Sequence, residues 1–136
     1  TRHPMIVLDA SAALELLLRA ATQRMLLARA LAADELLVAP HLLDIEVAHV
    51  LRRFVIGGEL AAARAEQALC DFAELRITRY PHRPLLPRIW QLRRNCSAYD
   101  AAYLALAEAV AAPLVTCDRR LAGVPGHRAR VECFPG

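Results

Sequence analysis

Two short apolar segments of this chain end in an aspartate and continue into a helix-like segment. The first is MIVLDAS at residues 5–11, and the second is PLVTCDRRL at residues 113–121. Short apolar runs of this kind, bounded by turn or helix-starting residues, predict buried strands. An acid at the end of such a strand either caps the following helix or serves a functional site. The repeated pattern therefore constrains both the fold and the location of a functional site, which is expected at the ends of these strands.

Short apolar strands alternate with helices along the sequence. Strands are expected at residues 5–8, 36–39, 76–79, 114–117 and 130–134. Helices are expected at about residues 12–19, 23–33, 42–55, 59–74, 84–94, 97–111 and 118–122, with Ser11 and Thr22 capping the first two. This alternation predicts an α/β fold, a three-layer α/β/α sandwich with a central, mostly parallel sheet of about five strands.

A chain of 136 residues without a linker or a change in composition is expected to form one domain over residues 1–136. Residues 1–4 precede the first strand and are either a native leader or foreign to the protein. Apolar residues make up 57% of the chain, which predicts burial of surface in a homodimer or a complex. No apolar stretch reaches the about 18–20 residues of a membrane helix, so no membrane partner is expected.

The cysteine and basic residues limit which metal sites, disulfides and phosphate-binding motifs the chain can form. The four cysteines form no C-x-x-C pair and no zinc-site spacing, so buried reduced thiols in a cytoplasmic protein are expected at Cys70, Cys96, Cys117 and Cys133. All seventeen basic residues are arginine. This excludes phosphate chemistry that needs a lysine, including the P-loop, while arginine still forms bidentate phosphate contacts.

Four acids are candidates for a site, and each has a structural alternative. Asp9 and Asp118 follow predicted strands and could be helix N-caps. Asp100 could be the third-position acid of a capping box opened by Ser97. Glu46 lies beside the apolar stripe of the predicted helix 42–55 and could simply face solvent. Each residue by itself leaves these alternatives open.

Considered together, the four acids predict a metal centre. The carboxyl ends of parallel strands lie at one edge of a sheet, and ligands bind outside that edge. Carboxylates gathered there repel each other and raise each other's pKa, a conflict that a divalent cation removes. Oxygen ligands favour Mg²⁺, for which Mn²⁺ could substitute, and such a site can activate water for phosphodiester hydrolysis.

Three segments of the chain resemble the successive motifs of PIN-domain ribonucleases, and more narrowly the VapC-type toxins of bacterial toxin–antitoxin pairs. They are MIVLDASAALELL, LLDIEVAHVLRR and NCSAYDAAYLALAEAVAAPLVTCDRRLA, and the resemblance runs from residue 5 to the end. It implies a PIN domain whose Asp9, Asp100 and Asp118 hold the metal directly. Glu46 would bind a water on the metal, or a second ion.

The resemblance also implies a function and partners. The activity would be metal-dependent cleavage of single-stranded or looped RNA in the bacterial cytoplasm. The partners would be a second copy of the chain and a VapB-type antitoxin that reaches the active-site groove. The alternative is a non-catalytic PIN-like module that binds RNA or protein. Receiver and haloacid-dehalogenase-like enzymes also place an aspartate after a strand, but the chain lacks their lysine and a D-x-D motif.

Further polar residues are candidates for supporting roles. Hydrogen bonds to the acids are expected from Ser11, Asn95 and Thr116, with helix capping and strand packing as the alternatives for Ser11 and Thr116. RNA phosphates are the expected partners of Arg93, Arg94, Arg119 and Arg120, with solvated helix surfaces as the alternative. Trp90 is expected to be a core anchor and not a stacking platform.

Overall fold

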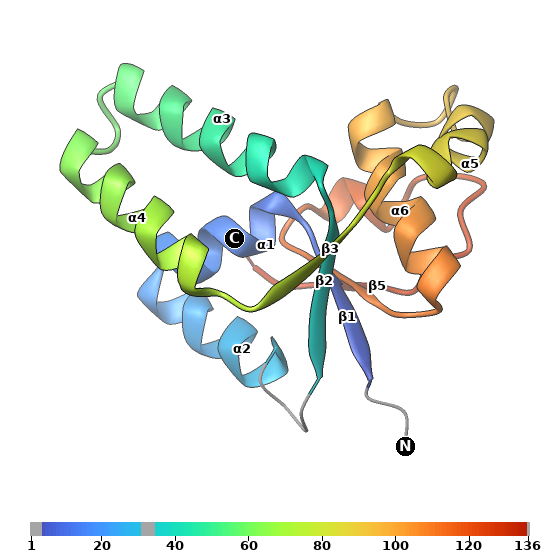
Figure 1. The fold of residues 1–136 in the computed structure, drawn as a ribbon, viewed down its shortest axis with the longest axis horizontal. Coiled ribbons are helices and arrows are strands. Elements are labelled where there is room, and N and C mark those ends of the chain that lie inside the picture. Colours follow the sequence, from blue (N-terminus) through green and yellow to red (C-terminus); the bar gives the residue numbers. More distant parts are fainter. Residues whose placement is uncertain (1–3, 31–34, 136) are drawn as a thin grey trace.

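A computed structural model describes residues 4–30 and 35–135 of the chain (Figure 1). The strands are β1 (Met5–Leu8), β2 (Leu36–Pro40), β3 (Ile77–Tyr80), β4 (Leu114–Thr116) and β5 (Val131–Cys133). The helices are α1 (Ala10–Leu18), α2 (Ala20–Ala30), α3 (Leu42–Ile56), α4 (Ala62–Glu74), α5 (Leu86–Gln91) and α6 (Ala98–Val110). Short 3₁₀ helices lie at Arg83–Leu85 and Arg119–Leu121.

The five strands form one parallel sheet in the order β3-β2-β1-β4-β5. The chain therefore runs outward from β1 to β3 on one side, and then returns to build β4 and β5 on the other. The topological switch lies between β1 and β4, which are hydrogen-bonded neighbours with Leu8 in register with Val115. In open α/β sheets this is the point where binding sites form, beyond the carboxyl ends of the strands.

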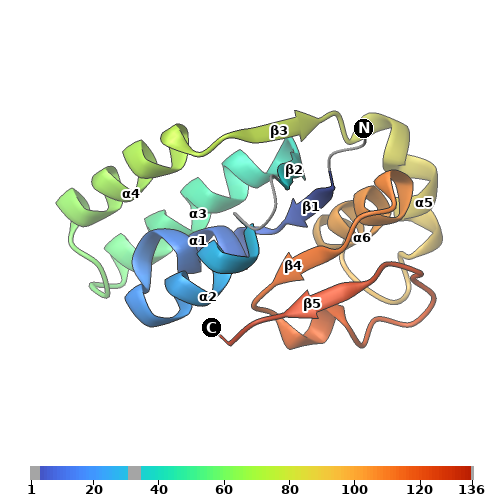
Figure 2. The ribbon, with the colours of Figure 1, turned by 90° about the horizontal axis from the view of Figure 1, so that it is seen from below.

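Helices cover both faces of the sheet, as predicted. Helices α1 to α4 lie on one side of the sheet, and α5 and α6 lie on the other (Figures 1 and 2). The middle of α6 is buried without a break from Ala101 to Ala107, which explains why this helix is the most continuously apolar one. The central strands are buried as well, with Ile6, Val7 and Leu114 fully inaccessible to solvent.

Several element boundaries differ from those predicted. Helix α1 begins at Ala10 because Asp9, and not Ser11, is its N-cap. Helix α2 begins at Ala20, so Thr22 lies inside it and is not its cap, and the predicted end at 31–33 lies outside the described residues. The predicted helix 84–94 is shorter, because a 3₁₀ turn precedes α5 and the helix ends at Gln91.

Two predictions about burial were wrong. Trp90 is 66% exposed, because Ile89 and Leu92 provide the buried side of α5 and the following turn. The cysteines are free among the described residues, but Cys70 and Cys133 are exposed, and Cys96 and Cys117 are only partly buried. Cys133 lies on β5, which is one of the two edge strands of the sheet. In the described part of the chain, no helix has the length and apolar character needed to cross a membrane.

Candidate active site

Asp9 is a buried carboxylate at the carboxyl end of β1. Its side chain is the N-cap of α1, because Oδ1 accepts a hydrogen bond of 3.0 Å from the amide of Ala12. The hydroxyl of Ser11 donates to the same oxygen at 2.7 Å, and the hydroxyl of Thr116 donates to Oδ2. Burial raises the pKa of Asp9 to about 6, although these hydrogen bonds oppose the shift, and the charge of Asp118 raises it further.

Ser11 and Thr116 connect the ends of the two central strands. The hydroxyl oxygen of Ser11 accepts a hydrogen bond of 2.9 Å from the amide of Cys117, just after β4. The hydroxyl oxygen of Thr116 accepts one of 2.9 Å from the amide of Asp118. Both hydroxyls therefore hold the Asp9 carboxylate in place and also fix the segment that carries Asp118.

Asp118 follows β4 and begins the 3₁₀ helix Arg119–Leu121. Its Oδ1 accepts a hydrogen bond of 3.0 Å from the amide of Arg120, so it too has the predicted capping geometry. The guanidinium of Arg120 donates to both carboxylate oxygens, at 3.1 Å and 2.7 Å. These hydrogen bonds lower the pKa of Asp118. Asp118 is therefore ionised and paired with a cation from its own chain.

Asp100 lies in the first turn of α6, which Ser97 caps by accepting a hydrogen bond of 3.1 Å from the amide of Asp100. Burial raises the pKa of Asp100, the charge of Arg120 lowers it, and the charge of Asp118 raises it. Asp100 is thus close enough to Asp118 for the two carboxylates to repel each other.

Glu46 reaches the site from α3, on the other side of the sheet. Its Oε1 accepts a hydrogen bond of 2.6 Å from the hydroxyl of Tyr103 on α6. Burial raises the pKa of Glu46, the Tyr103 hydrogen bond lowers it, and the charge of Asp100 raises it. The four predicted acids therefore form a chain of electrostatic neighbours, in which Asp9 and Asp100 both repel Asp118, and Glu46 repels Asp100.

An open cavity of about 520 Å³ lies between α3, the start of α6 and the segment that follows β4. It is lined by Glu46, Asn95, Cys96, Ser97, Tyr99, Asp100, Arg120, Gly123, Val124 and Pro125. The donor set suits a hard divalent cation, because the acids present only oxygen atoms, the ligands that such cations prefer. Among the residues that the structure describes, no three acid, histidine or cysteine side chains converge closely enough to enclose an ion. Arg120 also occupies both carboxylate oxygens of Asp118, so Asp118 would have to release Arg120 in order to hold a cation.

The other predicted site residues are divided between the cleft and its surroundings. Asn95 does not reach the acids, because its Nδ2 donates a hydrogen bond of 2.8 Å to the carbonyl of Pro125 and so holds one wall of the cleft. Arg93 lies over the Trp90 ring, 4.7 Å from its centroid. Arg94 and Arg119 are exposed. Of the four predicted arginines, only Arg120 lines the cavity.

Sequence reasoning missed Tyr103, which is 2% exposed and holds Glu46 through its hydroxyl. A signal was present in the motif YDAAY at residues 99–103, because residues three positions apart share one face of a helix. Tyr103 therefore had to point to the same side as Asp100.

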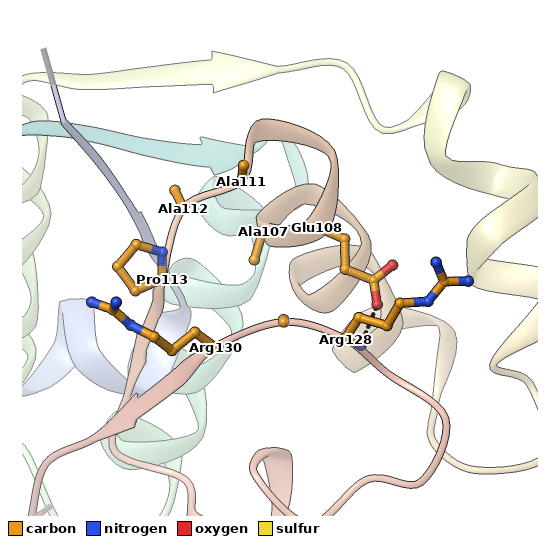
Figure 3. A pocket seen from close by; sticks show the side chains of 8 residues that line it. Ala107, Glu108, Ala111, Ala112, Pro113, Arg128 and Arg130 are labelled. Carbon is orange, nitrogen blue, oxygen red and sulfur yellow. Dashed lines mark hydrogen bonds between the residues drawn. The ribbon is translucent and has the colours of Figure 1, made fainter. Parts of the chain in front are cut away.

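A second hollow of about 360 Å³ lies at the other end of α6 and contains none of the four acids. Figure 3 shows its alanine and proline side chains, with Arg128 and Arg130 at its sides and Glu108 bonded to the backbone of Arg128. Glu108 is also paired with Arg88, at 2.8 Å. The charged groups here serve internal contacts, so the cleft with the acids is the candidate active site.

Comparison with known proteins decides the family. The sequence matches the PIN domain family over residues 6–126. The chain belongs to the PIN-domain family. Within it, the chain is 49% identical over 131 residues to the ribonuclease VapC9 of Mycobacterium tuberculosis, an alignment that covers 96% of this chain and 99% of that protein. The resemblance to VapC-type proteins seen in the sequence is therefore confirmed.

Solved structures show that the PIN fold is shared as a whole. A chain of VapBC2 from Rickettsia felis, solved bound to a DNA fragment from its promoter, superposes with a TM-score of 0.70 at 13% identity and covers 96% of this chain and 98% of that chain. VapBC-5 from Mycobacterium tuberculosis, of the VapBC toxin–antitoxin family, gives a TM-score of 0.59 at 21% identity and covers 97% and 98%. The predicted fold class is thus confirmed by PIN-domain neighbours over nearly the full chain.

Proposed function

We propose that this PIN-domain protein is an endoribonuclease, the toxin of a toxin–antitoxin pair, and that it hydrolyses RNA with Mg²⁺ or Mn²⁺. The observation that carries the proposal is the electrostatic coupling of the four acids at one end of the sheet, where Glu46 and Asp100 line the cleft. Burial raises the pKa of Asp9, Glu46 and Asp100, and the charge of a neighbouring acid raises each of them as well. Support also comes from the full-length similarity to proteins described as VapC ribonucleases.

The chain's own residues have distinct tasks in this reaction. Asp9, Asp100 and Asp118 are the residues that would hold the cation, and Glu46 would orient a water molecule or hold a second ion. When bound, the cation supplies an activated water and stabilises the charge that develops on the phosphate, leaving a 5′-phosphate and a 3′-hydroxyl. Ser11 and Thr116 keep the Asp9 carboxylate oriented, and Arg120, once displaced from Asp118, is placed to contact an RNA phosphate.

We infer two protein partners, a VapB-type antitoxin and a second copy of this chain. The antitoxin is supported by the similar structures of VapBC complexes. Both partners are supported by large apolar side chains that are exposed among the described residues, such as Ile45, Ile56 and Leu86. Action on cellular RNA and the free thiols of the described cysteines support a place in the bacterial cytoplasm.

Cleavage assays test the activity. Purified protein, free of antitoxin, should cut a mixture of cellular RNA with Mg²⁺ or Mn²⁺ and lose all cutting in EDTA. Asp9→Asn keeps an oxygen that can cap α1 but removes the charge, so it should fold normally and be inactive; Asp100→Asn should also be inactive. Asp71→Asn is the matched control, because Asp71 is exposed on α4 and accepts a hydrogen bond from Gln67, outside the cleft.

The competing function, a binding module without catalysis, makes the opposite prediction. It requires that the wild-type protein binds RNA or antitoxin without cutting RNA, and that calorimetry detects no Mg²⁺ or Mn²⁺ binding. Equal cleavage by wild type and Asp9→Asn would also overturn the proposed mechanism.

A further inference from the structure

Part of the active-site cleft is uncharged. Tyr99, Gly123, Val124 and Pro125 line the same cavity as Asp100 and Glu46. Tyr99 is 61% exposed, although an aromatic ring of this size is normally a core or interface residue. It directly precedes Asp100 in the first turn of α6, so its ring stands at the rim of the cavity beside one of the four acids.

The backbone fixes this part of the cleft. Ser97 caps α6 and so sets the orientation of its first turn, while Ala101 and Ala102 bury the opposite side of that turn. The segment with Val124 and Pro125 is held by the Asn95 side chain at Pro125, 2.8 Å away. It is held again at the carbonyl of Gly126, which accepts a hydrogen bond of 2.8 Å from Arg88. The backbone positions of Tyr99 and of the aliphatic residues opposite it are therefore fixed within one cavity before any ligand arrives.

We propose that Tyr99 is the stacking platform for an unpaired nucleobase next to the scissile phosphate, and that Val124 and Pro125 form the rest of its pocket. This inference rests on the proposed function and names how that site would recognise its substrate. A base in a duplex has both faces covered, so a stacking site of this kind accepts only bases in single strands, loops or bulges. Stacking on an aromatic ring tolerates all four bases, so Tyr99 selects for strand state and not for sequence.

Trp90 is the other large exposed aromatic residue of this region, and it is the weaker candidate. Its ring is already covered on one side by the guanidinium of Arg93, at 4.7 Å from the centroid. It also does not line the cavity that holds Asp100 and Arg120. Tyr99 is the exposed aromatic residue that shares the cavity with the acids.

A double-perturbation experiment tests the contact. The probe is a short, unstructured oligoribonucleotide of mixed sequence. The bond that wild type cuts is mapped first, and versions with one abasic position on either side of that bond are then compared. Tyr99→Ala should lower kcat/KM on the intact probe about 10-fold, mainly through KM, and one abasic version should lose about as much with wild type. Because both changes remove the same contact, Tyr99→Ala should cause no further loss on that abasic probe.

The controls separate stacking from structural damage. Tyr99→Phe keeps the ring and should retain wild-type kinetics. Glu66→Ala shortens an exposed side chain on α4 that does not line the cavity, and should also retain them. The melting temperature of Tyr99→Ala should equal that of wild type.

The experiment distinguishes a failure of the stacking role from a failure of the proposed nuclease function. Additive losses for every abasic position, or unchanged kinetics of Tyr99→Ala, would overturn the stacking role while leaving the nuclease intact. A wild-type protein that does not cut the intact probe or cellular RNA with either cation would overturn the proposed function and the stacking role with it.

Discussion

The hydroxyl of Tyr103 donates a hydrogen bond of 2.6 Å to Oε1 of Glu46, and this contact joins α6 to α3 across the active-site cleft. Tyr103 is buried, so its ring position is fixed by the core and not by the carboxylate that it holds. The acid that comes from the opposite side of the sheet is therefore oriented by a residue of the helix that carries Asp100.

Tyr103→Phe should leave the fold intact and impair cleavage. The hydrogen bond to Tyr103 lowers the pKa of Glu46, so its loss should raise that pKa and shift the acidic limb of the pH–rate profile to higher pH. The free energy of unfolding should fall by about 1 kcal/mol, as for one hydrogen bond. Cleavage rates across the pH range and urea unfolding measure both effects. An acidic limb that stays in place would contradict the role assigned to Tyr103.

The stability of the metal-free protein should decrease as the pH rises toward neutrality. The pKa of Asp9 is raised to about 6 by burial, above its ordinary value of 3.8. Its contribution is therefore fully present below the ordinary pKa and is lost as the pH rises through about 6. The full shift corresponds to roughly 3 kcal/mol, and Glu46 and Asp100 add in the same direction.

Thermal unfolding in EDTA at a series of pH values measures this decrease. Asp9→Asn should flatten the dependence, because asparagine does not titrate. Mg²⁺ should raise the melting temperature of wild type more at neutral than at acidic pH, since the cation compensates ionised carboxylates. Parallel pH curves for wild type and Asp9→Asn would show that Asp9 does not cause the loss.

Thr116→Val should be more harmful than its small change in volume suggests. The Thr116 hydroxyl donates to Asp9 and accepts from the amide of Asp118, so valine leaves both groups without that partner. We expect a loss of about 1–3 kcal/mol in stability and a further rise in the pKa of Asp9, with slower cleavage at neutral pH. The control is Thr78→Val on β3, where the side chain is exposed. Similar losses for the two variants would mean that the hydroxyl of Thr116 is unimportant.

Glu132→Gln should lower stability without changing catalysis. Arg29 on α2 donates to both oxygens of Glu132 on β5, at 2.6 Å and 2.9 Å. The hydrogen bonds from Arg29 lower the pKa of Glu132 to about 2, so its contribution is present above its ordinary pKa and is lost as the pH falls through about 2.

The loss for Glu132→Gln at neutral pH should be about 1–3 kcal/mol, because Arg29 keeps Glu35 as a second partner. Denaturant unfolding at neutral and strongly acidic pH measures it, and the difference from wild type should vanish in acid. Glu66→Gln, an exposed position on α4, is the control. A reduced kcat for Glu132→Gln would contradict the separation of this pair from the site.

The sequence predicted the sheet and the positions of its strands because each strand is a short apolar run next to a turn or helix signal. It also predicted that Asp9 and Asp118 would each follow a buried strand at one edge of the sheet. Each caps the helix that follows it, and their strands β1 and β4 prove to be hydrogen-bonded neighbours. For these two residues the structural and functional interpretations do not exclude each other, because a carboxylate that caps a helix still carries a charge that acts on neighbouring acids.

The sequence could not predict contacts between side chains that are far apart in the chain. The contacts of Tyr103 with Glu46 and of Asn95 with Pro125 join residues 57 and 30 positions apart, and local patterns contain no information about such pairs. The prediction that Trp90 is a core residue rested only on its hydrophobicity. In a helix of six residues, however, Ile89 already fills the buried side, and the next position turns outward.

The hydrogen bond from the amide of Asp9 to the carbonyl of Val115 closes a loop of more than one hundred residues. Strand β1 is therefore joined by β4 only after more than one hundred further residues have been made. A polypeptide that ends before Asp118 contains the residues of β1 and Asp9 but lacks one acid of the candidate site. Under the proposed function, this order of assembly would keep unfinished copies inactive during synthesis.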